Sequence, residues 1–475
     1  MNATADESVF SQIAEWNQAQ ELRAPKTKGT FYRNLEEALD LRRSQHNLIT
    51  LRKRKDNIDF SSNDFLSLAT SGQLREAFLE ELGRFPNFPV GSTGSRLLDG
   101  NNDYFEELEA EIAEFHGAER GLIVNSGFEG NSAIFSSIPR PGDAIVYDEL
   151  VHASAHEGMS RCMTEIKKSF RHNDVDSFRD SMEMVLEAHP LIQRGQRSVL
   201  VAVETVYSMD GDICPLGDMI EAAKEVLPHG NFQFIVDEAH ATGVIGEKGA
   251  GLVSALGLQK AVAIRLHTFS KALGASGAAI LCNDTVRTML VNHARPICFT
   301  TAASFPTLAA IKAAYRLLKT GETELARKRL NAHIRLFYKS ITSNSYYKEV
   351  RDAGIIDIPL ADEWESQSIL SHIVAVLTQP RHNYFLSIHL QLLRFWAFPV
   401  DPPAVPKGTN RVRIAFHASI TDDQVVGLAN AICEWATEML EIKKTGKEGA
   451  LPTAAQQVYK ITSLTPRFDQ YSVEC

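Results

Sequence analysis

Four reactive side chains lie at or just beyond the ends of short apolar runs in the middle of the sequence. Asp237 ends the run FQFIVD and is followed by His240, Lys271 follows AVAIRLHTFS, and Glu204 ends SVLVAVE. Runs of this length, bounded by Gly, Asp and Asn, are typical of strands buried on both faces of a sheet. Because ligands of open parallel sheets bind beyond the carboxyl ends of the strands, we expect these side chains to share one site.

These residue types fit one covalent cofactor. A lysine becomes a nucleophile near neutral pH when burial or a cationic neighbour lowers its pKa, and its main covalent use is a Schiff base with a carbonyl. Pyridoxal phosphate (PLP) needs such a lysine, and it needs an acid that keeps its pyridine nitrogen protonated. Lys271 and Asp237 can fill these positions. The turn Ser126-Gly127-Phe128, between an expected strand and an expected helix, offers the free N–H groups that bind a phosphate.

Two histidines of the same region allow a different interpretation, a metal site. His152 and His156 are four residues apart, which would place them on one face of a helix. No third ligand and no H-E-x-x-H pattern accompanies them. We therefore expect no metal at this site.

The elements that must position these residues alternate between strand and helix along the chain. Strands are expected over 121–127, 143–149, 198–205, 232–240, 261–271 and 277–284, and amphipathic helices over 104–117 and 216–227. This alternation predicts an α/β fold with a mostly parallel central sheet. After Thr300 the pattern becomes helical, gives short strands at 372–378 and 411–416, and closes with a helix near 422–442. That order predicts a smaller α+β domain.

The domain boundaries follow from these changes of pattern. We predict an N-terminal helical segment at 1–59, a large cofactor-binding domain at 60–305, a small C-terminal domain at 306–442 and a tail at 443–475. The basic run 52–55 within the first segment is interpreted as a solvated face.

Composition limits the possible functions. The 475 residues are 44% hydrophobic and 23% charged, which is ordinary for a globular protein, and the net charge is −10. This sign disfavours a protein that coats nucleic acid or an anionic membrane. No apolar run is long enough to span a bilayer, and no secretory signal is visible. The six cysteines lie far apart without a C-x-x-C pair, so we expect a cytoplasmic protein without a disulfide framework.

Eight motifs that arrive in order give the chain a resemblance to a known family. They are FSSNDFLSLA (60–69), GSTGSRLLDGN (91–101), NSGFEGN (125–131), DELVHASAHEG (148–158), ETVYSMDGDICPL (204–216), VDEAHATGVIGEKGAG (236–251), HTFSKALGASG (267–277) and GTNRVRI (408–414). Over about residues 33 to 440 the chain resembles the α-oxoamine synthases. These are PLP enzymes of the aspartate-aminotransferase fold, called fold type I, and the pattern is most similar to 8-amino-7-oxononanoate synthase.

The resemblance implies roles for the residues around the cofactor ring. Lys271 would form the Schiff base and later move the Cα proton of the substrate. Asp237 would pair with the pyridine nitrogen, His240 would hydrogen-bond the phenolic oxygen, and His152 would stack on the ring. Glu204 would border the reacting atoms.

It also implies a phosphate site that two subunits share. Ser126, Gly127 and Phe128 would form it with Thr268, and Ser208 would border the cofactor. A hydroxyl residue of the neighbouring subunit completes this site in the family, and Thr300 and Thr301 occupy the matching place. The expected molecule is therefore a homodimer.

The same resemblance assigns substrate binding to Arg413 and Asn63. Arg413 matches the arginine that holds the carboxylate of the amino acid; Arg411 lies on the same face of the expected strand, and only the motif register separates the two. One departure stands out. The family usually carries a histidine before threonine seven residues after this arginine, whereas here that place is Ile420 and a histidine appears earlier, at His417.

The implied activity is a decarboxylative Claisen-type condensation. A small amino acid, with alanine favoured and glycine or serine possible, would react with an acyl-CoA or carrier-bound acyl thioester to give an α-amino ketone, CO2 and the free thiol. The pathway would be biotin synthesis or a specialised polyketide or fatty-acyl route. Two alternatives stay open: an aminotransferase, and a non-catalytic partner subunit of a complex like serine palmitoyltransferase. Such partner subunits lack the cofactor lysine, which is present here as Lys271.

Overall fold

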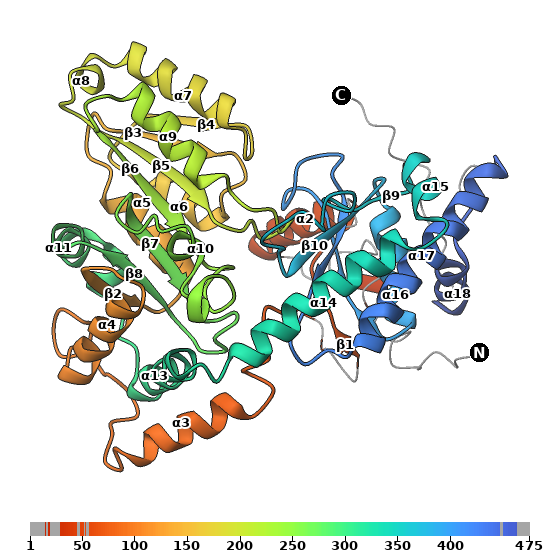
Figure 1. Ribbon diagram of the computed structural model, residues 1–475, viewed down its shortest axis with the longest axis horizontal. Coiled ribbons are helices and arrows are strands. Elements are labelled where there is room, and N and C mark those ends of the chain that lie inside the picture. Colours follow the sequence, from red (N-terminus) through yellow and green to blue (C-terminus); the bar gives the residue numbers. More distant parts are fainter. Residues whose placement is uncertain are drawn as a thin grey trace.

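The computed structural model describes residues 29–44, 48–51, 53, 57–446 and 450–462, together with residues 15, 18 and 19. Two lobes lie side by side and are connected through the long helix α14, Glu324–Thr342 (Figure 1). Most of the basic run 52–55 and most of the N-terminal segment before residue 29 lie outside the described residues. The four domain boundaries stay predictions.

The large lobe is built on a seven-stranded sheet with the order β2-β8-β7-β6-β5-β3-β4. Its strands are β2 Arg120–Val124, β3 Ala144–Asp148, β4 Ile166–Phe170, β5 Val199–Glu204, β6 Phe232–Asp237, β7 Val262–Thr268 and β8 Ala278–Cys282. Strands β3 to β7 run parallel, and β8 is antiparallel to both β7 and β2. The predicted α/β architecture with a mostly parallel sheet is confirmed.

Both faces of this sheet are covered, because alternate residues of each strand enter different cores. Val201 of β5 packs with α7 Val175–Ala188 and α9 Leu216–Val226, whereas its neighbour Leu200 packs with α5 Gly127–Ser137 and α6 Ala153–Ser160. The remaining helical elements of this lobe are α3 Gln73–Gly83, α4 Asp103–Phe115, α8 Pro190–Gln193, the 3-10 turn η1 Glu247–Gly249, α10 Leu252–Ala255, α11 Asp284–His293, α12 Arg295–Phe299 and α13 Phe305–Thr320.

The small lobe holds a four-stranded antiparallel sheet with the order β12-β13-β10-β9. Its strands are β9 Ile356–Asp357, β10 Ile373–Thr378, β12 Phe398–Val400 and β13 Arg411–Ala415. Beside them lie α2 Thr30–Ser44, α15 Tyr347–Asp352, α16 His382–Leu392 and α17 Asp422–Lys444. The expected strands at 372–378 and 411–416 and the expected final helix are present.

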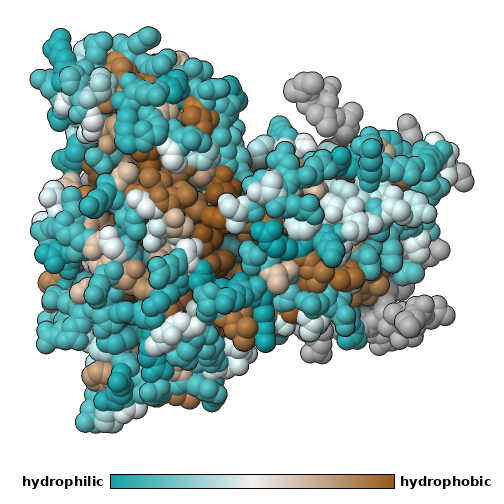
Figure 2. Space-filling model, in the orientation of Figure 1, coloured by the Kyte–Doolittle hydropathy of each residue, from teal (hydrophilic) through white to brown (hydrophobic). Residues whose placement is uncertain are grey.

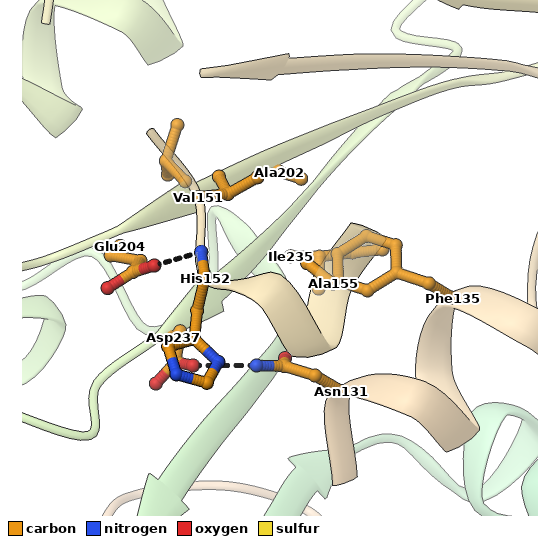
Figure 3. A pocket seen from close by; sticks show the side chains of 10 residues that line it. Asn131, Phe135, Val151, His152, Ala155, Ala202, Glu204, Ile235 and Asp237 are labelled. Carbon is orange, nitrogen blue, oxygen red and sulfur yellow. Dashed lines mark hydrogen bonds between the residues drawn. The ribbon is translucent and has the colours of Figure 1, made fainter. Parts of the chain in front are cut away.

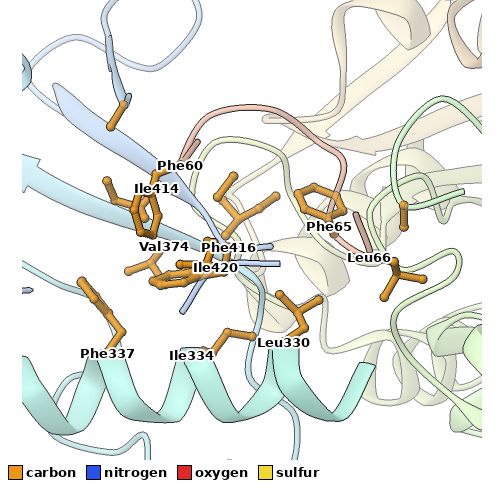
Figure 4. Close-up of a cluster of buried hydrophobic side chains, with 14 of the residues drawn as sticks. Phe60, Phe65, Leu66, Leu330, Ile334, Phe337, Val374, Ile414, Phe416 and Ile420 are labelled. Atoms are coloured by element: carbon orange, nitrogen blue, oxygen red, sulfur yellow. The ribbon is translucent and has the colours of Figure 1, made fainter. Parts of the chain in front are cut away.

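A segment from the beginning of the chain completes this lobe. Strand β1, Ile58–Asp59, pairs with β11, Phe395–Trp396, and the backbone N–H of Ala415 donates to the carbonyl of Phe60 at 2.8 Å. Phe60 and Phe65 enter an apolar cluster with α14, β10 and β13 (Figure 4). The chain order therefore brings residues 58–67 next to residues 411–420.

The predicted tail contains a helix. Helix α18, Thr453–Thr462, packs on α16, and Val458 is fully buried there with Ile388. The sequence between 443 and 457 is small and polar enough to resemble a linker, but Ala454, Ala455 and Val458 of α18 are buried.

Apolar side chains gather at the junction of the two lobes on the face shown in Figure 2, between surfaces that are mainly hydrophilic. In the part of the chain that the structure describes, no helix combines the length and apolar character that crossing a membrane requires.

Candidate active site

The carboxyl ends of three neighbouring strands place the predicted reactive residues together. Glu204, Asp237 and Thr268 end β5, β6 and β7, and Glu204 stands opposite Asp237 in the parallel register. Lys271 follows three residues after β7. The strand ends of a parallel sheet open at one edge, so the sequence-predicted cluster forms as expected.

The amine of Lys271 lies against an imidazole. Its Nζ is 2.8 Å from Nε2 of His240. Burial lowers the pKa of Lys271 to about 8, although Asp237 and Glu204 raise it. Burial also lowers the pKa of His240 well below its usual value, and the nearby Lys271 cation lowers it further. A neutral His240 can therefore receive a hydrogen bond from the lysine, and its Nδ1 has no partner among the described residues.

Asp237 is held in a fixed orientation. Its Oδ1 accepts a hydrogen bond from the backbone of Ala239 at 2.8 Å, and its Oδ2 accepts one from Asn131 Nδ2 at 2.8 Å. Asn131 comes from the covering helix α5 and also donates to Ser154 Oγ at 3.0 Å. Held by these contacts, Asp237 lies beside the ring of His152 (Figure 3).

A small pocket lies behind this carboxylate. It is partly open, and its empty space of about 220 Å³ includes volume that is continuous with the solvent. Its polar lining is Asn131, His152, Glu204 and Asp237, and the remaining lining is apolar. Figure 3 shows these four side chains converging from α5, α6, β5 and β6.

His152 begins helix α6 and is tied to Glu204. Its backbone N–H donates to Glu204 Oε1 at 2.5 Å, and its Nδ1 lies 2.7 Å from Ser154 Oγ. Burial raises the pKa of Glu204 well above its usual value, and Asp237 adds to that effect. Burial lowers the pKa of His152. The imidazole of His152 is therefore neutral at neutral pH, and it lies on the exposed side of the site.

The N-terminus of helix α5 lies at the place where the sequence predicts a phosphate site. Ser126 is its N-cap, and the Ser126 hydroxyl accepts from the backbone N–H of Glu129 at 3.1 Å. A Cβ atom at Gly127 would lie 2.3 Å from Thr268 Oγ1, so only glycine permits this approach. Phe128 is half exposed, with its ring 6.3 Å from that of His152.

The two threonines after α12 reach the same end of the molecule. Thr301 forms an isolated bridge with Ser95, and its carbonyl accepts from Asn125 Nδ2 at 3.1 Å. Thr301 is exposed and Thr300 is partly buried. Their predicted contribution to a second subunit is not tested by one chain.

The two arginines of β13 have different partners. Arg411 forms an ion pair with Asp210. Arg413 instead donates to three neutral oxygens, Ser208 O at 2.6 Å, Asn63 Oδ1 at 2.9 Å and Ser61 O at 3.4 Å. Burial lowers the pKa of Arg413 to about 10, which leaves it cationic at neutral pH. Among the described residues no carboxylate pairs with Arg413, so its charge remains available to a ligand.

The departure from the family pattern has a structural role. The ring nitrogens of His417 lie 2.9 Å from the backbone carbonyls of Asp59 and Ser62, so His417 holds the segment that carries Asn63. Ile420 is buried in the apolar cluster with Phe416 (Figure 4).

Some members of the site were not predicted. Asn131 lies in the NSGFEGN motif, and a signal was present, since it is a polar residue that is buried one turn into helix α5. The contacts made by the backbone carbonyls of Ser61 and Ser208 could not be predicted from the sequence, because every residue has a backbone carbonyl. Within residues 57–446 and the other described ranges, no group of three or more His, Cys, Asp or Glu side chains could hold a metal ion.

Comparison with known proteins gives a consistent result. The family model for aminotransferase class I and II matches residues 55–432. The aminoacyl transferase sphA of Aspergillus fumigatus is 50% identical over 463 residues, which cover 96% of this chain and 98% of that protein. The 8-amino-7-oxononanoate synthase of Emericella nidulans is 42% identical over 384 residues, which cover 81% and 90%.

A solved structure agrees with the fold as well. The structure of SPT, serine palmitoyltransferase, with PLP superposes with a TM-score of 0.67 at 26% identity. The superposition covers 82% of this chain and 89% of the other.

Proposed function

The chain belongs to the aminotransferase class I and II family and, within it, to the α-oxoamine synthases, and on this premise we propose that it joins a small amino acid to an acyl thioester. The Cα–H bond of the amino acid breaks, a bond forms between Cα and the thioester carbonyl carbon, and the thiol leaves. The carboxyl group is then lost as CO2, and a proton returns to Cα. The products are an α-amino ketone, CO2 and the free thiol.

The cofactor of this enzyme is pyridoxal 5'-phosphate, and the residues present fit it. The Nδ1 atom of His240 is buried without a partner among the described residues, and Gly127 leaves room for a group at the N-terminus of α5. Lys271 would hold the cofactor covalently, Asp237 its ring N–H, and His240 its phenolic oxygen. When bound, the cofactor supplies an electron sink for the electron pair that remains when the Cα proton leaves.

The phosphate would lie at the N-terminus of α5. The free N–H groups of the first helical turn and the hydroxyls of Ser126 and Thr268 favour an anion there. We propose that Thr300 or Thr301 reaches the phosphate of a second copy, which makes the working enzyme a homodimer. Ser208 borders the cofactor through the turn that follows β5.

Lys271 would carry the proton at Cα. With a pKa of about 8, its amine exchanges a proton readily near neutral pH, which an ordinary lysine with a pKa of 10.5 does not. His152, neutral and exposed to the site, would stack on the cofactor and orient the substrate carboxyl. Glu204 fixes the backbone of His152 by accepting a hydrogen bond from its N–H.

The observation that carries the substrate class is Arg413. A guanidinium that faces only neutral oxygens, on the site that holds Lys271, can accept the carboxylate of an amino acid in a bidentate pair. Ser208 O and Asn63 Oδ1 would hold Nε and one terminal nitrogen of Arg413, and the substrate carboxylate would take the remaining N–H groups, in place of the long 3.4 Å contact to Ser61 O. Arg411 does not have this freedom because it is paired with Asp210.

We favour alanine as the amino acid, with glycine and serine as the other small candidates. For the acyl partner we propose a polyketide or fatty-acyl thioester of a specialised pathway. The similarity to an aminoacyl transferase extends over 96% of this chain, whereas the similarity to the 8-amino-7-oxononanoate synthase extends over 81%.

A substrate panel tests the proposal. The purified enzyme with PLP is given alanine, glycine or serine and acyl-CoA thioesters of increasing chain length, and thiol and CO2 release are measured together. We expect equal amounts of both with one amino acid and a preferred acyl length. Keto-acid formation without thiol release would identify an aminotransferase and overturn the proposal. A protein that neither develops the absorbance of bound PLP nor turns over any pair would point to a non-catalytic subunit.

A further inference from the structure

The turn Tyr207–Asp212, which follows β5, connects the two lobes at the site. It is closed by hydrogen bonds between the backbones of Tyr207 and Asp212 at 3.1 Å and of Gly211 and Tyr207 at 2.9 Å. Gly211 has a φ of 75°, and a Cβ there would lie 2.0 Å from the carbonyl of Ile373 in β10. The turn therefore belongs to the large lobe by sequence and touches the small lobe by packing.

On the small-lobe side this turn holds both arginines of β13. Asp210 pairs with Arg411, and the carbonyl of Ser208 accepts from Arg413 Nε at 2.6 Å. The Ser208 carbonyl makes the shortest of the contacts that orient the Arg413 guanidinium. Any shift of the turn would therefore move the proposed carboxylate-binding group.

On the large-lobe side the turn is held by His172. Its Nδ1 lies 2.9 Å from Asp148 Oδ1, at the end of β3, and its Nε2 contacts Asp212 Oδ2. Asn173 supports the same pair, because its Nδ2 donates to Asp212 Oδ2 at 2.6 Å and its backbone N–H donates to Asp148 Oδ2 at 2.8 Å. One imidazole thus joins the ends of β3 and β4 to the turn after β5.

The two carboxylates that contact His172, those of Asp148 and Asp212, determine the charge of its ring. A carboxylate can only accept, so both ring nitrogens of His172 carry hydrogen and the ring is an imidazolium. Burial lowers the pKa of His172, but the hydrogen bonds to Asp148 and Asp212 raise it to about 10. The other groups near the ring are Tyr207, which packs edge-on at 4.4 Å, and Asn173, whose Nδ2 lies 3.4 Å from Nε2. Glu149 accepts from the His172 backbone N–H at 3.1 Å.

We infer that His172 is a positioning residue for the amino-acid substrate: as an imidazolium between Asp148 and Asp212, it fixes the 207–212 turn and thereby the guanidinium of Arg413. This inference rests on the proposed function, because it takes Arg413 as the carboxylate-binding residue. His172 touches no reacting atom. Its loss therefore weakens amino-acid binding and leaves the binding of the acyl thioester intact.

A double-mutant cycle on the enzyme with bound PLP tests this route. The affinity for alanine is measured by absorbance titration for the wild type, His172→Gln, Arg413→Lys and the double variant. We expect His172→Gln to weaken alanine binding about tenfold in the wild type and to have little further effect in the Arg413→Lys background. Equal effects in both backgrounds would show that His172 does not act through Arg413 and would overturn the inference.

The separate variants keep the two claims apart. Arg413→Lys with unchanged alanine affinity would refute the proposed role of Arg413, whereas His172→Gln with unchanged affinity would refute only the role of His172. His389→Gln is the matched control, because His389 is similarly withdrawn from water in α16 but lies outside this network. We expect it to leave both alanine and acyl-thioester KM values unchanged, so a general loss of stability would be recognised.

Two further measurements remain decisive if His172→Gln does not fold. Asp212→Asn keeps the shape of the turn and removes one carboxylate, and we expect it to raise the KM for alanine while the KM for the acyl thioester stays constant. In the wild type, nitrogen NMR of labelled histidine should show the ring of His172 as an imidazolium that does not titrate between pH 6 and 8. A neutral His172 at pH 7, or equal changes in both KM values, would contradict the inference.

Discussion

Glu204 shows how a single buried acid is adapted to this site. Its carboxyl is nearly removed from water, lies near Asp237 and accepts the backbone N–H of His152. Burial and the neighbouring acid both disfavour its charged form, so its pKa lies well above the usual value. Ionisation of Glu204 therefore costs free energy and destabilises the folded chain. A neutral side chain of the same shape would avoid this cost.

We predict that Glu204→Gln stabilises the protein freed of PLP at pH 8 and not at pH 4.5. The folded chain holds this proton more tightly than the unfolded chain, so wild-type stability falls as pH rises from about 4.5 and levels off above the folded pKa. Glutamine keeps an oxygen for the His152 N–H and does not titrate. Thermal midpoints of both proteins across this pH range check the prediction, and a constant difference at all pH values would contradict it.

At the level of single residues, the sequence predicted which side chains form the reactive cluster but not which groups hold those side chains in place. Lys271, Asp237 and His240 could be found because they lie at or just after the ends of buried strands. Charged side chains are rarely buried at such positions unless they are paired or functional. The difference between Arg411 and Arg413 could not be found, because it depends on Asp210 and on backbone carbonyls contributed by distant segments. The catalytic roles of these residues stay predictions until variants are measured.

At the level of secondary structure, helix α5 positions several groups of the site. It begins directly after β2, presents the anion site at its N-terminus, and brings Asn131 to Asp237 one turn further on. The approach of Gly127 to Thr268 fixes how close this helix lies to the end of β7. The distance between phosphate and ring positions is therefore built into one helix and two strand ends.

We predict that Gly127→Ala weakens PLP binding by about tenfold or more. The added methyl group would lie 2.3 Å from Thr268 Oγ1, so Thr268 must turn its hydroxyl away from this position or α5 must move away from β7. Gly217→Ala is the matched control, since Gly217 also lies in the first turn of a helix and has no atom within 4 Å of such a methyl group. Absorbance titration with PLP measures both, and equal affinities for the two variants would contradict the prediction.

Among the elements, the apolar runs predicted six strands of the large sheet because strands covered on both faces need continuous apolar sequence. Strand β4 was missed because IKKSF alternates, with lysine and serine in an edge strand that is only partly covered. The reversed direction of β8 has no local signature, since a buried strand reads the same in either direction. Helix α18 was missed because it follows a stretch of small and polar residues, and the burial of Ala454 and Val458 depends on α16.

At the scale of the whole molecule, helix α18 is the last helix of the small lobe that the structure describes. Val458 and Ala454 of α18 fill a contact with Ile388 of α16, which in turn packs on α17 and β13. Residues 454–458 are thus part of the small lobe's packing.

We predict that Val458→Ala loosens α18 by about 2 kcal/mol, which corresponds to roughly thirtyfold faster opening. Gln457→Ala, one residue earlier and exposed, should leave the helix unchanged. Hydrogen exchange of the α16 and α18 amides measures both. Unchanged protection in Val458→Ala would show that α18 does not depend on this contact.

The contact between Asn63 and Arg413 joins residues 350 positions apart. All residues proposed here to face PLP lie between 126 and 301, whereas the amino-acid site needs a strand that the ribosome delivers more than a hundred residues later. During synthesis, the chain would therefore acquire the elements for its cofactor well before it could select a substrate. An enzyme arranged in this order cannot begin to process amino acids with an incomplete chain, because the residue that recognises them is among the last to arrive.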